Sequence, residues 1–390
     1  MTSPGAAILG RVHKRLFALR LAVRSRGWPV AAQRTVPAAT SVRLSGFFSE
    51  ALGIGSAADM TAAALEAAGH IIVREDLRPL HRRLLTRRPE PFSDGSGAKI
   101  WLIHANPPEA RIALFARDTE AWRDLYRIGY WTWESSLAPA DWLEAARWFH
   151  EIWVPAPSVR DAFADAFAKS PWPEAAKKLR VMPHPVPALP LHAHRTNAFT
   201  AVTLFDPRSD VERKNPASAI AAWIAAFPAP GDARLIVKSL PQSGDALSAL
   251  QSLAVSRPDI AFRCEALSRA DTEALIADSD VVISLHRGEG FGLTLAEAMT
   301  AGVCVVATGW SGNMAFMTPD NSMPVPYRLV PANPRHNGPQ AQWADPDIEA
   351  AAQALRRLRD DPGLRARLAE KARADIAALH AAWQTPFTGH

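Results

Sequence analysis

Residues 281–302, with the sequence VVISLHRGEGFGLTLAEAMTAG, decide the fold class of this chain. The first five residues are an apolar run with the length and β-branched content of a buried strand. Gly288, Gly290 and Gly292 then interrupt the run, and a helical segment follows that ends at Gly302. A strand, a glycine-rich loop and a helix in this order form the repeating unit of parallel α/β sheets.

The same alternation runs through most of the chain. From residue 41 onward, short apolar runs alternate with longer alanine-rich helical segments, as in parallel βαβ units. The runs expected to form strands are residues 42–44, 71–74, 99–104, 128–133, 151–155, 180–183, 198–205, 234–239, 260–264, 281–286 and 304–308. We therefore predict an α/β protein built from doubly wound parallel sheets.

A proline-rich stretch divides this alternation into two halves. Residues 182–190 read MPHPVPALP, and neither a helix nor a central strand could run through them. We expect a basic segment at 1–40, two Rossmann-like domains at 41–188 and 189–365 that face a central cleft, and a C-terminal helix at 366–390. One option for that helix is to pack back on the first domain. A ligand would lie in the cleft, at the carboxyl ends of the parallel strands.

The composition is that of a globular protein. Apolar residues make up 48% of the 390 residues and charged residues 21%, which argues against general disorder. No apolar run reaches the roughly 18 residues of a membrane-spanning helix, and no signal peptide is recognisable. We expect a cytoplasmic protein.

The beginning of the chain is unusually basic. Residues 1–49 contain seven arginines, one lysine and no acidic residue. Val12, Leu16, Leu19 and Val23 recur at helical spacing, with most of the basic residues on other faces. One interpretation is an amphipathic helix that docks on anionic lipid at the inner face of the plasma membrane, and the other is a solvated tail. A transit peptide is a weaker third interpretation. The basic residues between 78 and 88 belong either to the same surface or to a solvated loop.

Glu289 and Glu297 are the acidic residues of the stretch quoted first. Glu289 lies in the glycine loop, and Glu297 lies in the first turn of the next helix, where it would form a capping box with Thr294. Capping explains neither Glu289 nor the glycines around it. Glycines let a backbone approach a ligand closely, and the N–H groups at a helix start attract an anion such as a diphosphate. Carboxylates there can accept hydrogen bonds from sugar hydroxyls.

Two adjacent cations, Arg213 and Lys214, precede another helical run. Cations are the wrong charges for a helix start, because the helix dipole favours acids there. A solvated loop is the ordinary explanation for such a pair. We favour a phosphate partner because the pair belongs to the same predicted domain as Glu289. Arg208 and Ser209 are further candidates from this loop.

Two segments of the first domain are candidates for facing the cleft. Gly53 and Gly55 lie in the first strand-to-helix connection, without the spacing of a dinucleotide fingerprint and without a phosphate-loop lysine. Residues 129–134, GYWTWE, end another strand and contain Trp131 and Glu134. Aromatic faces beside a carboxylate suit a carbohydrate, although core packing is an equal explanation for Trp131.

His286 and Asn313 are placed where a base or sugar could be contacted, after the strands predicted at 281–286 and 304–308. For His286 a structural, hydrogen-bonded role is the favoured interpretation. No histidine pattern has metal-ligand spacing, so we predict neither a metal nor another cofactor. No nucleophile elbow is present either.

These motifs together resemble those of retaining glycosyltransferase family 4, in its bacterial polysaccharide-assembly branch. The most specific match is residues 284–299, SLHRGEGFGLTLAEAM, with its two glutamates separated by seven residues. Residues 205–216, 307–313, 129–134 and 151–155 extend the resemblance, which runs from about residue 41 to 352. It implies a GT-B fold, with the acceptor in the first domain and a nucleotide sugar in the second.

The resemblance also implies roles by position. Glu289 would hold the transferred sugar, and Glu297 would hold the ribose. Arg213 and Lys214 would stabilise the diphosphate, with Arg208 as the alternative to Arg213. Many members place a first-domain histidine near the donor sugar; here Glu134 or Asn106 would stand in. The remaining candidates are Gly290, Phe291, Gly292, Leu293, Ser209, His286 and Asn313 on the donor side and Gly53, Gly55 and Trp131 on the acceptor side.

The resemblance implies metal-independent, retaining transfer from a nucleoside-diphosphate sugar to a saccharide or lipid-linked acceptor in surface polysaccharide assembly. GDP-mannose is the first donor to consider. Expected partners are these substrates and an anionic membrane surface, but not nucleic acid. The alternatives are a nucleotide-sugar epimerase, a glycogen-synthase-like polymerase, and a catalytically silent scaffold that binds a partner.

Overall fold

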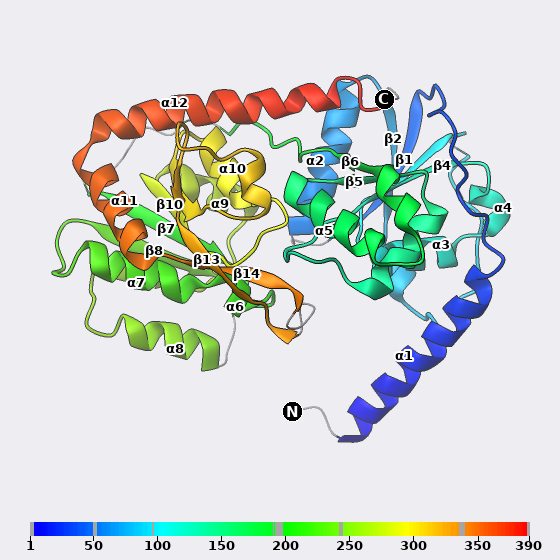
Figure 1. Cartoon of the computed structure of the whole chain (residues 1–390), viewed down its shortest axis with the longest axis horizontal. Helices are drawn as coiled ribbons and strands as arrows, with labels where there is room; N and C mark the ends of the chain where they lie inside the picture. The colour runs from blue at the N-terminus through cyan, green and yellow to red at the C-terminus, as the bar shows by residue number, and fades with distance from the viewer. Residues whose placement is uncertain are drawn as a thin grey trace.

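The chain forms two α/β units, each built on a six-stranded parallel sheet (Figure 1). The computed structural model describes residues 4–49, 53–95, 97–189, 191, 198–241, 245–334 and 340–387, and for residues 4–11 and 245 it describes the backbone alone. The first sheet has the order β2-β1-β3-β4-β5-β6. Its strands are β1 (Ser41–Gly46), β2 (Ile71–Asp76), β3 (Ile100–Ile103), β4 (Tyr126–Tyr130), β5 (Glu151–Val154) and β6 (Leu179–Val181).

The second sheet has the order β12-β11-β10-β7-β8-β9. Its strands are β7 (Thr200–Phe205), β8 (Arg234–Ser239), β9 (Ile260–Arg263), β10 (Val281–Ser284), β11 (Cys304–Thr308) and β12 (Met323–Val325). Every residue of β3, β4 and β11 is buried, as expected for parallel strands covered on both faces. The predicted alternation is therefore confirmed, and all eleven predicted strands are present within a few residues of their expected ends.

Helices cover both faces of each sheet (Figure 1). Those of the first unit are α2 (Gly53–Ala67), α3 (Pro107–Ala116), α4 (Thr119–Trp122) and α5 (Pro157–Ala168), with short 3-10 helices η1 (Arg78–His81), η2 (Ala140–Trp148) and η3 (Pro173–Lys178). Those of the second unit are α6 (Val211–Lys214), α7 (Pro216–Ala226), α8 (Asp245–Leu253), α9 (Arg269–Ala277), α10 (Leu293–Thr300), α11 (Ile348–Asp360), α12 (Pro362–Leu379) and the 3-10 helix η4 (Gly312–Ala315).

The C-terminal segment connects the second unit to the first. Helix α12 begins at Pro362 and packs on the second unit through Ala372 and Ile376. The 3-10 helix η7 (His380–Trp383) then brings Trp383 against Trp153 of β5, with ring centroids 5.8 Å apart. The indole Nε1 of Trp383 donates a hydrogen bond of 2.7 Å to the carbonyl of Pro183. Figure 1 shows α12 running along one side of the molecule from one unit to the other.

The basic N-terminal segment contains a helix, α1 (Pro4–Ser25), that projects from the first unit (Figure 1). Leu21 is buried against this unit, and the ring of Phe17 contacts Phe115 of α3 edge-on at 5.3 Å. Within the described part of the chain, no helix is long and apolar enough to cross a membrane.

Candidate active site

The loop that carries Glu289 connects β10 to α10, at the carboxyl edge of the second sheet. We call residues 287–292 the glycine loop. Ser311 and Gly312, which follow β11, hold it in place. The N–H of Glu289 donates to the Ser311 hydroxyl at 2.8 Å, and the N–H of Gly312 donates to the carbonyl of Glu289 at 2.9 Å. Gly292 begins α10 with a φ of +92°, a conformation that favours glycine.

Arg213 and Lys214 lie on α6, a single turn that docks against the glycine loop. Asp210 caps this turn by accepting a hydrogen bond from the N–H of Arg213. Asn215 ends it with a φ of +51°, and its side-chain amide donates to the carbonyl of Leu285 at 2.9 Å. The N–H of Arg287 donates to the carbonyl of Arg213 at 2.7 Å. The structure therefore brings together the two cations and Glu289 as the sequence predicted.

Glu289 is held by both cations. Its Oε1 lies 2.5 Å from Lys214 Nζ and 3.6 Å from Arg213 Nη1, which also donates to the carbonyl of Gly288 at 2.7 Å. Burial by itself raises the pKa of Glu289, but Lys214 and Arg213 outweigh burial and lower this pKa to about 2. The group is therefore a permanent anion near neutral pH.

Arg213 links the two units electrostatically. Its side chain is 7% exposed, and its Nη2 lies 3.7 Å from a carboxylate oxygen of Glu134 in the first unit. Burial lowers the pKa of Arg213, but Glu134 and Glu289 together raise it above its ordinary value. One buried cation thus pairs with one carboxylate from each unit.

The glycines of the loop allow the first unit to pack against it. A Cβ atom placed on Gly288 would lie 2.1 Å from the carbonyl oxygen of Glu134, and one placed on Gly290 would lie 2.0 Å from Oγ1 of Thr132. A Cβ atom on Gly312 would lie 2.2 Å from the carbonyl oxygen of Gly290. Gly288 and Gly290 thus leave room for Glu134 and Thr132 of the first unit, while Gly312 leaves room for the glycine loop itself. The predicted contact of Gly290 and Gly292 with a ligand stays a prediction.

The predicted capping box at Thr294 and Glu297 is wrong. Helix α10 begins at Leu293 with Gly292 as its N-cap, so Thr294 lies inside the helix and Glu297 lies beyond its first turn. The Glu297 side chain instead accepts a hydrogen bond of 2.9 Å from Arg269 of α9. Burial raises the pKa of Glu297, and Arg269 opposes that effect. Gly302, with a φ of +78°, follows the helix end as predicted.

Arg208 and Ser209 lie in the turn after β7. Arg208 is mostly exposed and makes a two-pronged ion pair with Asp206, while the Ser209 hydroxyl donates to the carbonyl of Asp206 at 2.6 Å. Arg213, not Arg208, is the arginine that reaches Glu289 in this structure. Which of the two arginines binds the diphosphate stays a prediction.

Three further donor-side candidates are buried around the loop. Phe291 packs edge-on against His184, at the boundary between the units, with ring centroids 5.0 Å apart. The amide of Asn313 donates to the carbonyl of Thr308 at 2.9 Å. His286 is fully buried, and burial lowers its pKa to about 4. A side-chain hydrogen bond with Asn313 opposes this effect of burial, and the structural role favoured for His286 stays a prediction.

The first-unit candidates divide into two groups. Gly53, at the start of α2, faces Leu293 of α10, and Gly55, two residues further on, is buried. The side chain of Asn106 accepts a hydrogen bond of 2.8 Å from the N–H of Thr132 and so holds the segment that meets Gly290. Trp131, in contrast, is fully buried between Phe149 and Phe163. Our prediction that Trp131 contacts the acceptor is wrong, because its ring belongs to the core.

A buried aromatic cluster that was not predicted from the sequence lies beside the site. His104 follows β3, and its ring stacks on Tyr130 at 4.3 Å. Tyr130 lies 5.1 Å from His184, which in turn contacts Phe291 of the glycine loop. Burial lowers the pKa of His104 to about 3 and also lowers that of His184. The signal for His104 was its place at the end of a predicted strand, at the same sheet edge as Glu134.

A hairpin of β13 (Tyr327–Pro331) and β14 (Gln342–Pro346) also joins the two units. The N–H of Gln342 donates to the Ser136 hydroxyl at 2.8 Å, and Leu137 packs on the cluster around Trp343. On its other side, Asp345 pairs with Arg287 of the glycine loop at 3.1 Å. The hairpin therefore touches both the first unit and the loop.

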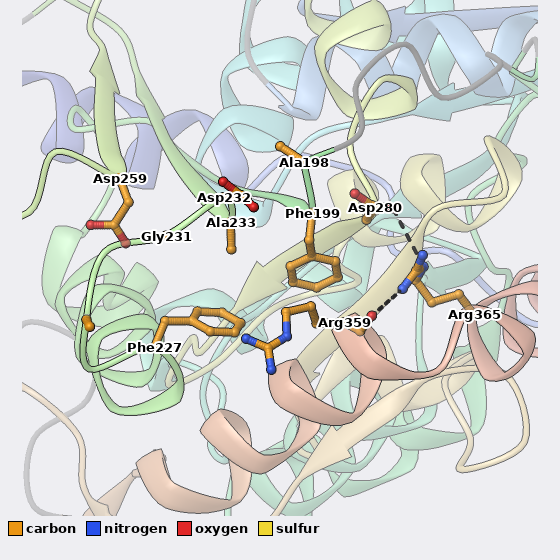
Figure 2. Close-up of a pocket in the computed structure, with 11 residues that line it drawn as sticks. Ala198, Phe199, Phe227, Gly231, Asp232, Ala233, Asp259, Asp280, Arg359 and Arg365 are labelled. Atoms are coloured by element: carbon orange, nitrogen blue, oxygen red, sulfur yellow. Dashed lines mark hydrogen bonds and ion pairs between the residues drawn. The ribbon is translucent and has the colours of Figure 1, made fainter.

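A separate cavity of about 490 Å³ lies at the opposite, amino edge of the second sheet (Figure 2). Arg365 pairs with Asp280, the residue before β10, and donates to the carbonyl of Arg359 at 3.1 Å. Arg359 lies over the ring of Phe227. These contacts give both arginines structural partners, and no residue of the site around Glu289 lines the cavity. No group of three or more potential metal ligands occurs among the described residues.

A family model described as Family 4 Glycosyltransferase in conflict systems matches residues 157–388, which is more than half of the chain. The chain belongs to glycosyltransferase family 4. It is therefore a glycosyltransferase, and the enzyme class predicted from its motifs is confirmed. The match covers the glycine loop, Arg213 and Lys214. No individually curated protein matches the sequence.

Solved structures show that the fold is GT-B. Sucrose-phosphate synthase from Thermosynechococcus elongatus superposes with a TM-score of 0.63 and 14% identity, covering 89% of this chain and 97% of that one. Anabaena HepE, solved with UDP and glucose, gives 0.58 and 14%, covering 88% and 97%. Staphylococcus aureus TarM, solved with UDP and a saccharide, gives 0.56 and 12%, covering 74% of this chain. This chain spans 55% of the length of TarM.

Proposed function

We propose that this enzyme transfers a sugar from a nucleoside-diphosphate sugar to a saccharide or lipid-linked acceptor in surface polysaccharide assembly. The observation that carries the proposal is Glu289 held by Lys214 and Arg213 beneath the start of α10. An ionised carboxylate binds sugar hydroxyls, and two cations beside it match the diphosphate of the same donor. The solved relatives that contain UDP, and HepE with UDP-glucose, support this donor class.

The proposed reaction retains the configuration of the transferred sugar and needs no metal. The bond between the anomeric carbon and the diphosphate oxygen breaks, and the acceptor oxygen forms the new bond on the same face. Arg213 and Lys214 neutralise the charge that develops on the departing phosphate, and that phosphate takes the acceptor proton. Glu289, with a pKa of about 2, stays ionised and serves as an anchor, not as a proton donor.

The test is a panel of UDP-, GDP- and dTDP-sugars, with GDP-mannose first and UDP-glucose beside it. We expect release of the nucleoside diphosphate from at least one donor, undiminished by EDTA. Glu289→Gln should lower turnover by roughly 100-fold or more, because the loss of one preorganised electrostatic partner has that size of effect. Glu349→Gln, on the exposed face of α11, is the matched control and should leave turnover unchanged.

Three outcomes would contradict the proposal. Neither binding nor turnover of any donor would remove the nucleotide-sugar assignment. Full activity of Glu289→Gln would remove the assigned role of that residue. Recovery of an epimerised nucleotide sugar, with no diphosphate released, would favour the epimerase alternative.

A further inference from the structure

Helix α1 has two opposite faces with different surroundings. Phe17, Leu21 and Ser25 face the first unit and are partly or fully buried. On the other side Val12, Leu16, Leu19 and Val23 are 49%, 50%, 64% and 57% exposed. At about 3.6 residues per turn, these four form one stripe roughly opposite the docked face. The described residues provide no cover for this stripe.

Contacts of the docked face with the first unit set the orientation of α1, and therefore the direction in which the apolar stripe points. The guanidinium of Arg20 donates to the carbonyls of Leu84 and Arg87 at 2.7 and 2.6 Å, and that of Arg24 donates to the carbonyl of Arg117 at 2.9 Å. Both guanidiniums also lie 5.1 Å from the centre of the Phe115 ring. The helix is therefore anchored to the first unit by several contacts and is not a solvated tail.

The same contacts bring a second basic segment beside α1. We call residues 82–88 the basic loop; its carbonyls receive Arg20, and its Arg82, Arg83 and Arg88 are exposed. On the helix itself, Arg15 and Arg26 are exposed next to the apolar stripe. Residues 1–49 contain no acidic residue that could neutralise these charges.

We propose that the apolar stripe of α1 and the basic loop together form a docking surface for an anionic lipid bilayer. Aliphatic side chains at the boundary of headgroups and acyl chains, flanked by cations that contact anionic headgroups, are the chemistry of interfacial helices. A second copy of the chain fits this surface less well, because its approach would bring like charges together. The proposal requires no nucleotide sugar and is independent of the transfer reaction.

The test is co-sedimentation of the full chain with vesicles of phosphatidylcholine alone and of phosphatidylcholine mixed with phosphatidylglycerol. We expect binding to the anionic vesicles, release by added salt, and little binding to neutral ones. Each basic residue near such a surface contributes roughly fivefold to partitioning, so Arg82→Glu with Arg88→Glu should weaken binding by roughly 20-fold or more. Leu16→Ser with Leu19→Ser should have a comparable effect.

Leu253→Ser with Val255→Ser is the matched control, because these residues are 51% and 88% exposed on the second unit, away from α1. It should bind vesicles like the unchanged chain. Circular dichroism and diphosphate release without vesicles check that every variant is folded. Equal binding of all variants, or no binding to anionic vesicles, would overturn the proposal. A dimer in light scattering that Leu16→Ser with Leu19→Ser dissolves would assign the stripe to a second copy instead.

Discussion

At the scale of single residues, opposing effects act on the carboxyl group of Glu289. Burial raises its pKa, and two cations within 3.6 Å lower it further than burial raises it. In the sequence, Glu289 and Glu297 look alike. In the structure one is bound to the proposed phosphate-binding cations, while the other pairs with Arg269 of α9. Equal residue types in one motif therefore have different electrostatic surroundings.

Gly290 gives the sharpest test of the packing between the two units. Gly290→Ala places a methyl group 2.0 Å from Thr132 Oγ1, and overpacking of this kind costs about 1–3 kcal/mol in the free energy of unfolding. Thr132→Ala removes that oxygen and should restore most of the loss when combined with Gly290→Ala. Urea unfolding of both single variants and the double variant measures the coupling.

Gly288→Ala is the comparison for this cycle. The added Cβ atom would lie 2.1 Å from the backbone oxygen of Glu134, and no side-chain substitution removes that oxygen. Thr132→Ala should therefore leave Gly288→Ala as destabilised as before. Strictly additive effects for the Gly290 and Thr132 pair would show that the two units do not meet there in solution.

At the scale of helices and strands, the sequence predicts those elements whose own pattern is strong. Strand β11 is buried along its whole length and apolar from Cys304 to Ala307, so it is recognisable without knowledge of its neighbours. The hairpin β13–β14 was not predicted. Tyr327, Arg328 and Leu329 in β13 are exposed, and prolines end both strands, so neither strand has an apolar pattern of its own. Its place is set by contacts with Ser136 and Leu137 of the other unit.

Substitution of Trp383 tests whether the C-terminal segment of the second unit packs on the first unit. Its ring is 2% exposed and packs on Trp153, and its indole N–H is bound to Pro183. Trp383→Ala should lower the free energy of unfolding by about 3–5 kcal/mol, since it removes a buried aromatic ring and leaves a cavity. Ala381→Ser, in the exposed part of η7, is the control for the same segment. A loss below about 1 kcal/mol in urea unfolding would contradict the packing described here.

At the scale of the whole molecule, the site depends on contacts between units that lie far apart in sequence. Thr132 and Gly290, or Glu134 and Arg213, meet only when both sheets are folded and face each other. Local patterns carry no information about such a meeting. The motifs therefore predict Glu289, Arg213 and Lys214, but not the packing of Thr132 and Glu134 against the glycines. Buried histidines were missed for the same reason, because burial of His104 and His184 is set by the tertiary fold.

Two buried histidines, His104 and His286, give a prediction about acid stability. Burial lowers the pKa of His104 to about 3 and that of His286 to about 4, from an ordinary value of about 6.5. Between these values the unfolded chain binds protons that the folded chain does not, so stability is complete above about pH 6.5 and falls as the pH falls toward 4. Each of these two histidines should lower the free energy of unfolding by about 2 kcal/mol between pH 7 and pH 5. Glu289 adds nothing in this interval, because its own contribution is lost only below about pH 4.5.

Urea unfolding at pH 7, 6 and 5 measures this dependence. His286→Gln removes one of the titrating groups, so the slope of stability against pH should become shallower even if the variant is less stable at every pH. The slope is the decisive quantity, because a purely structural loss at position 286 shifts the whole curve without changing its steepness. An unchanged slope for His286→Gln would mean that folding does not lower the pKa of His286.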